Sequence, residues 1–109
     1  MYISITGLKP KGLRGFFKFW MLAVPSFNQA RTARGNLHCS VKRIQGQQCT
    51  LTAWESRELM LDFMRSGAHL KAMKAFRSMA TGKTYGFEAE TVPDWAAAFA
   101  RLQRDGRAY

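Results

Sequence analysis

Segments with the hydrophobic spacing of strands and segments with the spacing of helices follow one another along this chain. Their order is the feature that most limits the fold. Residues 2–8, 37–42, 49–54 and 83–89 alternate side chains at period two, which is typical of strands. Residues 15–33 and 56–79 instead carry apolar side chains at helical spacings. The order strand, helix, strand, strand, helix, strand predicts a split βαβ domain with an antiparallel sheet.

Turn and cap residues set the boundaries of these elements. Gln45-Gly46-Gln47 separates the second and third strands and predicts a β-hairpin. Ser56 is predicted to cap the next helix, with Glu58 in its first turn, and Ser66-Gly67 is expected to divide that helix. Pro25 has no N–H to donate, so we expect the first helix to form two pieces there.

A further helix is predicted at the C-terminal end. Trp95, Phe99 and Leu102 follow at i, i+4 and i+7, and Gly106 is placed to end the helix. The preceding residues fit a capping box with proline in the first turn: Thr91-Val92-Pro93-Asp94. The chain therefore reads as one α+β domain over residues 1–109, with a ferredoxin-like βαββαβ core and an extra C-terminal helix.

The size of the chain bears on how the sheet is covered. A chain of 109 residues fits one domain, and its 47% hydrophobic content is enough for a core. We expect the helices to lie on one face of the sheet, which leaves the other face in need of a cover. A second copy would supply it, so we predict a homodimer with its sheets packed face to face.

The chain is strongly basic. It has 17 Lys and Arg against 7 Asp and Glu, which gives a net charge of +10. Such a charge attracts nucleic acid, phosphorylated metabolites or lipid headgroups, but it also simply keeps a protein in solution. Because the cations are spread along the whole chain, we interpret them first as solvated surface and second as a site for a polyanion.

Several sequence features bear on compartment and metal binding. Cys39 and Cys49 lie in neighbouring strands without a signal peptide ahead of them, so we expect reduced thiols and a cytoplasmic protein. The most apolar stretch, 16–27, is interrupted by Lys18 and Pro25, so no membrane insertion is expected. The two His and two Cys lack the paired spacing of a zinc site, and we predict no metal.

One region of the sequence resembles a known family. The match covers a strand, a helix start and a later histidine: Thr50-Leu51-Thr52-Ala53-Trp54-Glu55-Ser56-Arg57-Glu58, Phe63 and Ser66-Gly67-Ala68-His69. These residues resemble the third strand and second helix of the antibiotic biosynthesis monooxygenase superfamily of dimeric α/β barrels. The resemblance implies that fold, but its members include cofactor-free monooxygenases, haem-degrading enzymes and proteins of no known activity.

The resemblance leaves the cofactor open between none and haem. In the haem-degrading branch a Trp in the second helix and a His ten residues later carry the site, and the matching positions here are Phe63 and Met73. A weaker likeness, through 16–20 and Ala53-Trp54-Glu55, is to the spheroidene monooxygenase group. That likeness implies a hydrophobic substrate and haem.

His69 is the titratable residue nearest to an apolar helical stripe, since Met73 and Phe76 follow at i+4 and i+7. Facing a cavity, it could accept a proton or ligate haem, because its ordinary pKa lies near neutrality. The alternative is a histidine at a helix start that bonds to the backbone. The predicted walls of a substrate pocket are Trp54, Phe63, Met73 and Trp20, and the alternative for the large aromatics is ordinary core packing. His38 is expected on the surface or in a dimer interface.

These observations lead to one hypothesis and two alternatives. The leading hypothesis is a dimeric protein that binds a small apolar or aromatic molecule between sheet and helices and acts as a monooxygenase. The first alternative is a module without catalysis whose basic surface engages nucleic acid or another polyanion. The second is an accessory protein that works through its dimer alone. An enzyme needs an enclosed pocket containing His69, whereas a polyanion binder needs one continuous basic face.

Overall fold

A five-stranded antiparallel sheet forms the centre of the molecule. The computed structural model describes residues 1–108, with only the backbone of residues 77–79. The strands, in chain order, are β1 (Tyr2–Pro10), β2 (Asn36–Ile44), β3 (Gln47–Trp54), β4 (Ala80–Glu88) and β5 (Arg107–Ala108). They lie in the order β2-β3-β1-β4-β5. The predicted ferredoxin-like α+β fold is therefore confirmed.

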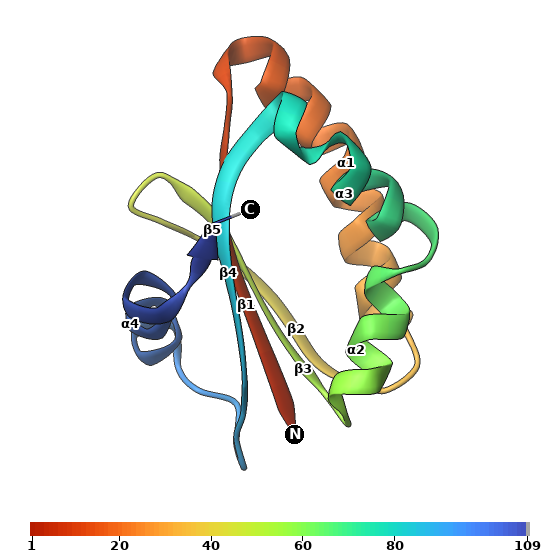
Figure 1. The fold of residues 1–109 in the computed structure, drawn as a ribbon, viewed down its shortest axis with the longest axis vertical. Coiled ribbons are helices and arrows are strands. Elements are labelled where there is room, and N and C mark those ends of the chain that lie inside the picture. The colour runs from red at the N-terminus through yellow and green to blue at the C-terminus, as the bar shows by residue number, and fades with distance from the viewer. Residues whose placement is uncertain (109) are drawn as a thin grey trace.

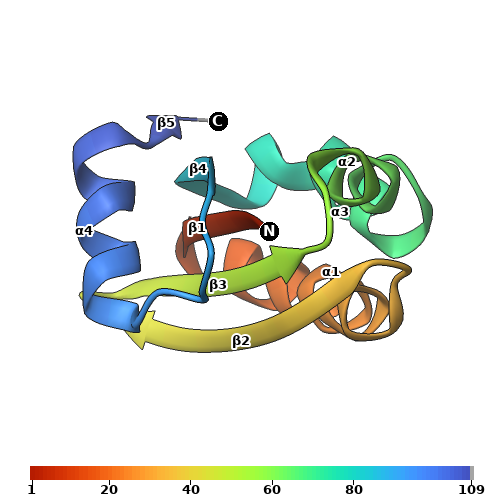
Figure 2. The ribbon, with the colours of Figure 1, turned by 90° about the horizontal axis from the view of Figure 1, so that it is seen from below.

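Helices cover both faces of this sheet. α1 (Gly12–Thr32), α2 (Arg57–Met64) and α3 (Gly67–Met79) lie on one side, and α4 (Trp95–Asp105) lies on the other (Figures 1 and 2). The expectation that all helices share one face is therefore wrong. Ala98 and Leu102 of α4 pack in a common core with the sheet residues Ile3, Ile5, Leu51 and Ala53. The chain itself thus supplies part of the cover for which the sequence predicts a second copy.

Two predictions for the N-terminal part of the chain need correction, the break at Pro25 and the end of the first strand. α1 is one continuous helix through Pro25, because Ser26 and Ala30 beyond the proline are buried, as is Phe19 before it. Packing on both sides of Pro25 thus holds the helix together despite one missing donor. The strand β1 also runs through Pro10, which pairs with Ala80 of β4, and so extends two residues beyond the predicted end at residue 8.

The predicted hairpin is confirmed. β2 and β3 pair antiparallel from Ile44 opposite Gln47, and the turn residues Gln45 and Gly46 both have positive φ, 51° and 77°. Positive φ at both central residues is the mark of the two-residue turn that matches the twist of a hairpin. A register shift in β2 between Asn36 and His38 disturbs the alternation at its first residues.

One of the two predicted helix caps is confirmed, and the other is wrong. Ser56 caps α2 as predicted, since its Oγ accepts a hydrogen bond from the backbone N–H of Leu59 at 3.2 Å. α4 is capped by Asp94, whose Oδ1 accepts from the N–H of Ala97 at 2.8 Å, and not by Thr91. A cap at Thr91 would require helical dihedrals at Val92, which the following Pro93 disfavours. The helix therefore begins only after the proline.

Two further features are absent from the described part of the chain. No helix there is long and apolar enough to cross a membrane. Within residues 1–108, no group of three or more His, Cys, Asp or Glu residues is arranged to hold a metal ion.

Candidate functional site

A cavity of about 540 Å³ lies between the sheet and the helices α1, α2 and α3. Its two walls differ in chemistry. The helices contribute mainly apolar side chains, whereas the sheet contributes hydroxyl-bearing residues together with Lys42, Arg43 and Gln48. The hydroxyl-bearing residues of β1, β3 and β4 in the lining are Ser4, Thr6, Thr50, Thr52 and Thr84. A pocket with apolar walls and a few placed polar groups is the usual form of a small-molecule site.

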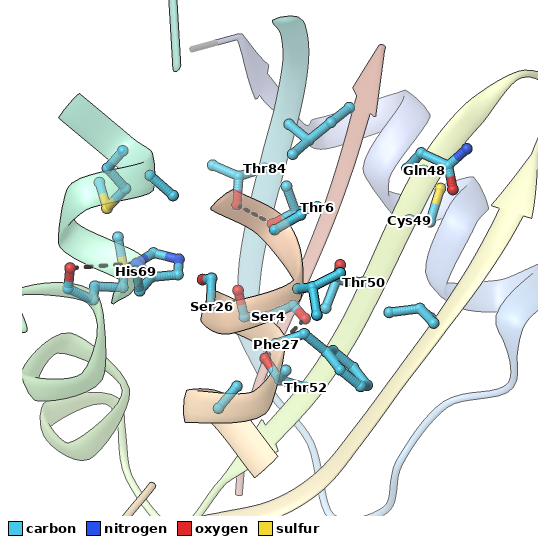
Figure 3. Close-up of a pocket in the computed structure, with 18 of the residues that line it drawn as sticks. Ser4, Thr6, Ser26, Phe27, Gln48, Cys49, Thr50, Thr52, His69 and Thr84 are labelled. Atoms are coloured by element: carbon cyan, nitrogen blue, oxygen red, sulfur yellow. Dashed lines mark hydrogen bonds between the residues drawn. The ribbon is translucent and has the colours of Figure 1, made fainter. Parts of the chain in front are cut away.

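Strand register produces this hydroxyl wall. Thr6 lies directly opposite Thr50 on one neighbouring strand and Thr84 on the other, and Ser4 lies opposite Thr52. The Oγ1 atoms of Thr6 and Thr84 are 3.2 Å apart, within hydrogen-bond distance (Figure 3). Because side chains alternate along a strand, the interleaved Ile3, Ile5 and Leu51 point to α4 instead.

The hydroxyl wall was not predicted from the sequence. A partial signal for it was present, since serine and threonine recur at period two in two separate strand segments, as Ser4/Thr6 and as Thr50/Thr52. Whether those hydroxyls share one face of the sheet depends on the register between strands that are far apart in the chain, which the local pattern does not specify.

An aromatic row connects the end of the sheet to α3. The Trp54 ring stacks on the Phe63 ring with 5.1 Å between centroids, and Phe63 contacts the His69 ring at 4.5 Å. Trp54 is fully buried, and its indole N–H donates to Thr52 Oγ1 at 3.0 Å. This row limits the orientations open to the imidazole of His69.

His69 lies with its Nδ1 against the backbone carbonyl of Met64 at 3.3 Å. A carbonyl oxygen can only accept, so in this bond Nδ1 carries the proton and the neutral ring keeps Nε2 as an acceptor. Figure 3 shows the other edge of the ring pointing into the cavity, toward the side where Ser26 lies. Burial lowers the pKa of His69 below its ordinary value, although the bond to Met64 opposes this. The ring is therefore a neutral base at pH 7.

Gln29 of α1 fixes the start of α3, where His69 lies. Its Oε1 accepts from the backbone N–H of His69 at 2.9 Å, and its Nε2 donates to the carbonyl of Ser66 at 3.0 Å. Gly67 permits this approach, since it has φ of +57° and an added Cβ would lie 2.9 Å from the Gln29 Oε1. Gln29 is thus a positioning residue for the imidazole.

All five site residues predicted from the sequence line the cavity: His69, Trp54, Phe63, Met73 and Trp20. Their roles stay predictions. Trp20 and Met73 are each 38% exposed, which places them at the rim. His69 also makes the backbone bond of the alternative interpretation, so the two interpretations are compatible. Outside the cavity lining, His38 on β2 pairs its Nε2 with Ser40 Oγ at 3.0 Å.

The cysteines do not supply a nucleophile. Both are free thiols. Burial raises the pKa of Cys39 to about 11, although the Arg31 guanidinium acts in the opposite direction, and burial also raises the pKa of Cys49. Protonated thiols are poor nucleophiles at neutral pH. Of His69 and the two cysteines, His69 is therefore the residue suited to accept a proton at neutral pH.

Comparison with known proteins bears on the fold. No protein-family model matches the sequence, and no curated protein matches it either. Several solved structures, however, are similar to this one. A protein described as an antibiotic biosynthesis monooxygenase from Deinococcus radiodurans is 19% identical, with a TM-score of 0.71 over 86% of this chain and 97% of that one.

Two further structures are similar. One, described as an antibiotic biosynthesis monooxygenase from Nitrosomonas europaea, is 12% identical, with a TM-score of 0.71 over 84% of this chain and 100% of that one. The other is SnoaB, described as a cofactor-independent oxygenase from Streptomyces nogalater, which is 13% identical, with a TM-score of 0.66 over 85% of this chain and 97% of that one. At these identities the likeness concerns the fold alone. The chain has the ferredoxin-like fold of the antibiotic biosynthesis monooxygenase-like proteins, as the sequence resemblance implied.

Proposed function

We propose that this protein binds a small aromatic molecule in the cavity between the sheet and helices α1 to α3 and oxidises it with O₂, with His69 as the proton acceptor. The observation that carries the proposal is the position of the His69 imidazole at the cavity wall, with its Nδ1 donating to the Met64 carbonyl and its other edge toward the cavity. Fold-mates that include a cofactor-independent oxygenase are consistent with it.

The proposed reaction begins with the transfer of a proton from the substrate to His69. A CH₂ group between aromatic rings, acidified by conjugation, loses a proton to His69 Nε2, and the resulting carbanion is electron-rich enough to react with O₂. One oxygen atom becomes a carbonyl on that carbon, and the other leaves as water with the two hydrogens of the CH₂ group. The carbon loses four electrons and O₂ gains four, so O₂ is the only oxidant that this reaction requires. Hydroxyls of Thr6, Thr50 and Thr84 would hold the polar end of the substrate.

The residues of the haem-degrading branch are not reproduced in this cavity. At the two positions where that branch carries Trp and His, the lining holds Phe63 and Met73, and neither has a ring nitrogen. These side chains do not fit that haem site, so no step of the proposed reaction runs through haem.

The arrangement of the cations favours the cavity over a polyanion as the main ligand site. The exposed Arg14 and Lys74 lie on α1 and α3, whereas Arg104 lies on α4, across the sheet. Arg104 is also paired with Asp105 at 3.0 Å. The cations of the chain are thus divided between the two sides of the sheet and are not all gathered on one face, as the polyanion interpretation would favour.

The experiment is a comparison of His69→Ala with His38→Ala, which removes the histidine outside the cavity. Anthrone is the probe, because its CH₂ lies between two aromatic rings. Oxygen consumption by His69→Ala should fall at least 100-fold relative to the wild type, since general base catalysis contributes on that order. His38→Ala should consume oxygen at the wild-type rate.

Binding and stability complete the test. Anaerobic binding of anthrone, followed by tryptophan fluorescence, should persist in His69→Ala, and urea unfolding should show a folded variant. A wild-type rate in folded His69→Ala would contradict the proposal. A titration with hemin is a further check, because a sharp Soret band that depends on His69 would make the residue a haem ligand instead of a proton acceptor.

A further inference from the structure

The outer side of α1 carries an exposed apolar stripe. Its residues recur at i, i+3, i+4, i+7, i+8 and i+11, so they lie on one side of the helix. They are Leu13 (74% exposed), Phe16 (44%), Phe17 (60%), Trp20 (38%), Met21 (75%) and Val24 (50%). The buried residues of the same helix point away from the stripe, since Phe19 packs against Ala80 of β4 and Ala30 lines the cavity. A continuous apolar surface of this kind marks an interaction site.

Cations border the α1 apolar stripe. Arg14 and Lys18 lie three residues before Phe17 and Met21 respectively, so they follow one edge of the stripe. α3 packs beside α1 (Figure 1) and adds the exposed Lys71 and Lys74. Neither helix contains Asp or Glu, and the first acidic residue of the chain is Glu55. The face formed by α1 and α3 is therefore both apolar and positively charged.

Charge decides between the occupants of this face. A second copy would bring the same cations against Arg14 and Lys18, with no carboxylate on α1 or α3 to pair them. A nucleic acid would satisfy the charge, and aromatic rings could stack on its bases, but the most exposed side chains of the stripe are the aliphatic Leu13 and Met21. Aliphatic and aromatic side chains bordered by Lys and Arg are the composition of helices that lie in the interface of an anionic membrane.

We propose that the α1 apolar stripe docks on the surface of an anionic lipid bilayer, with its long side chains in the headgroup region and the bordering cations on lipid phosphates. The cavity adjoins this surface, since Trp20 and Val24 belong both to the stripe and to the cavity lining. An apolar molecule dissolved in the bilayer would thus lie beside the rim of the cavity. The docking itself rests on exposure and charge, and does not require that the cavity bind a ligand.

Vesicle flotation tests the docking. The full-length protein should float with vesicles of phosphatidylcholine and phosphatidylglycerol, and at least tenfold less with phosphatidylcholine alone. Raising the salt from 0.1 M to 0.5 M should weaken binding to the anionic vesicles, because the cations are then screened. The double variant Leu13→Gln/Met21→Gln, whose positions lie outside the cavity lining, should bind at least tenfold more weakly. The matched control is Leu37→Gln, an equally conservative change at a 53% exposed leucine on β2.

Three results would overturn the docking: equal vesicle binding by the double variant, no binding of the wild type to anionic vesicles, or tighter binding to a single-stranded oligonucleotide that the double variant loses. Loss of self-association in the double variant without vesicle binding would instead assign the stripe to a second copy. Anaerobic anthrone binding by the double variant separates this proposal from the cavity function. It should match the wild type, whatever the vesicles show.

Discussion

At the scale of single residues, the neighbours of His69 determine its tautomer and the orientation of its ring. The Met64 carbonyl can only accept, which fixes the tautomer, and Phe63 restricts the ring plane. His69 and its apolar neighbours could be predicted, because an i, i+4, i+7 stripe is a local pattern. The hydroxyls of Thr6, Thr50 and Thr84 could not, because they meet only through the register of three strands.

The lowered pKa of His69 predicts a pH effect on stability. The unfolded chain protonates this histidine near its ordinary pKa of about 6.5, whereas the folded chain, in which burial lowers the pKa, does so only at lower pH. Between those two values the unfolded state binds more protons, so stability falls as the pH drops below about 6.5. Urea unfolding at pH 7 and pH 5.5 should show a larger loss for the wild type than for His69→Gln. The same loss in both proteins would contradict the assignment of this effect to His69, and His38→Gln serves as the control.

At the scale of elements, local rules account for the helices and strands, and tertiary packing accounts for the exceptions. Alternation and helical spacing placed β1 to β4 and α1 to α4 close to their observed bounds. Pro25 was expected to break α1, but the local pattern does not reveal that Ser26 and Ala30 are buried on the same helix. The predicted start of α4 was wrong. The reason is local and is visible in the sequence, because Pro93 disfavours helical dihedrals at the preceding Val92.

The corrected cap predicts a stability difference between two neighbouring positions. Asp94→Ala removes the carboxylate that accepts from the N–H of Ala97, so it should lower the free energy of unfolding by about 1 kcal/mol. Thr91→Ala, at the position the sequence first suggested, should change it by less than about half as much. Urea denaturation of both variants measures the difference. If Thr91→Ala is the more damaging change, the cap assignment is wrong.

At the scale of the whole molecule, the two faces of the sheet pack against different helices. The face with Ile3, Ile5 and Leu51 builds the core with α4, and the face with Ser4, Thr6 and Thr50 builds the cavity with α1 to α3. The sequence could not assign α4 to a side, because its apolar stripe fits either face. Since α4 already covers part of the second face, a partner copy has less sheet to cover than the sequence suggested.

The homodimer stays a prediction at this scale. An open groove between the β2–β3 turn and α4, lined by Ile44, Trp95 and Phe99, is a surface that a second copy could cover. Sedimentation equilibrium at micromolar concentration should give about twice the chain mass of 12.4 kDa. Ala96→Glu/Ala100→Glu, on the α4 side of this groove, should shift the mass toward the monomer. A wild-type mass of one chain would contradict the dimeric barrel and leave the cavity within one chain unaffected.

The central claim is that the cavity between the hydroxyl wall and α3 takes a small aromatic ligand, and anaerobic binding of anthrone tests it most directly. Ala72→Phe places a ring in the space that Ala72 of α3 lines, whereas Ala97→Phe adds the same ring at an exposed position on α4. We predict that Ala72→Phe weakens binding at least tenfold, while Ala97→Phe and the wild type bind alike and all three remain folded by circular dichroism. Equal binding by Ala72→Phe, or none by the wild type, would contradict the claim.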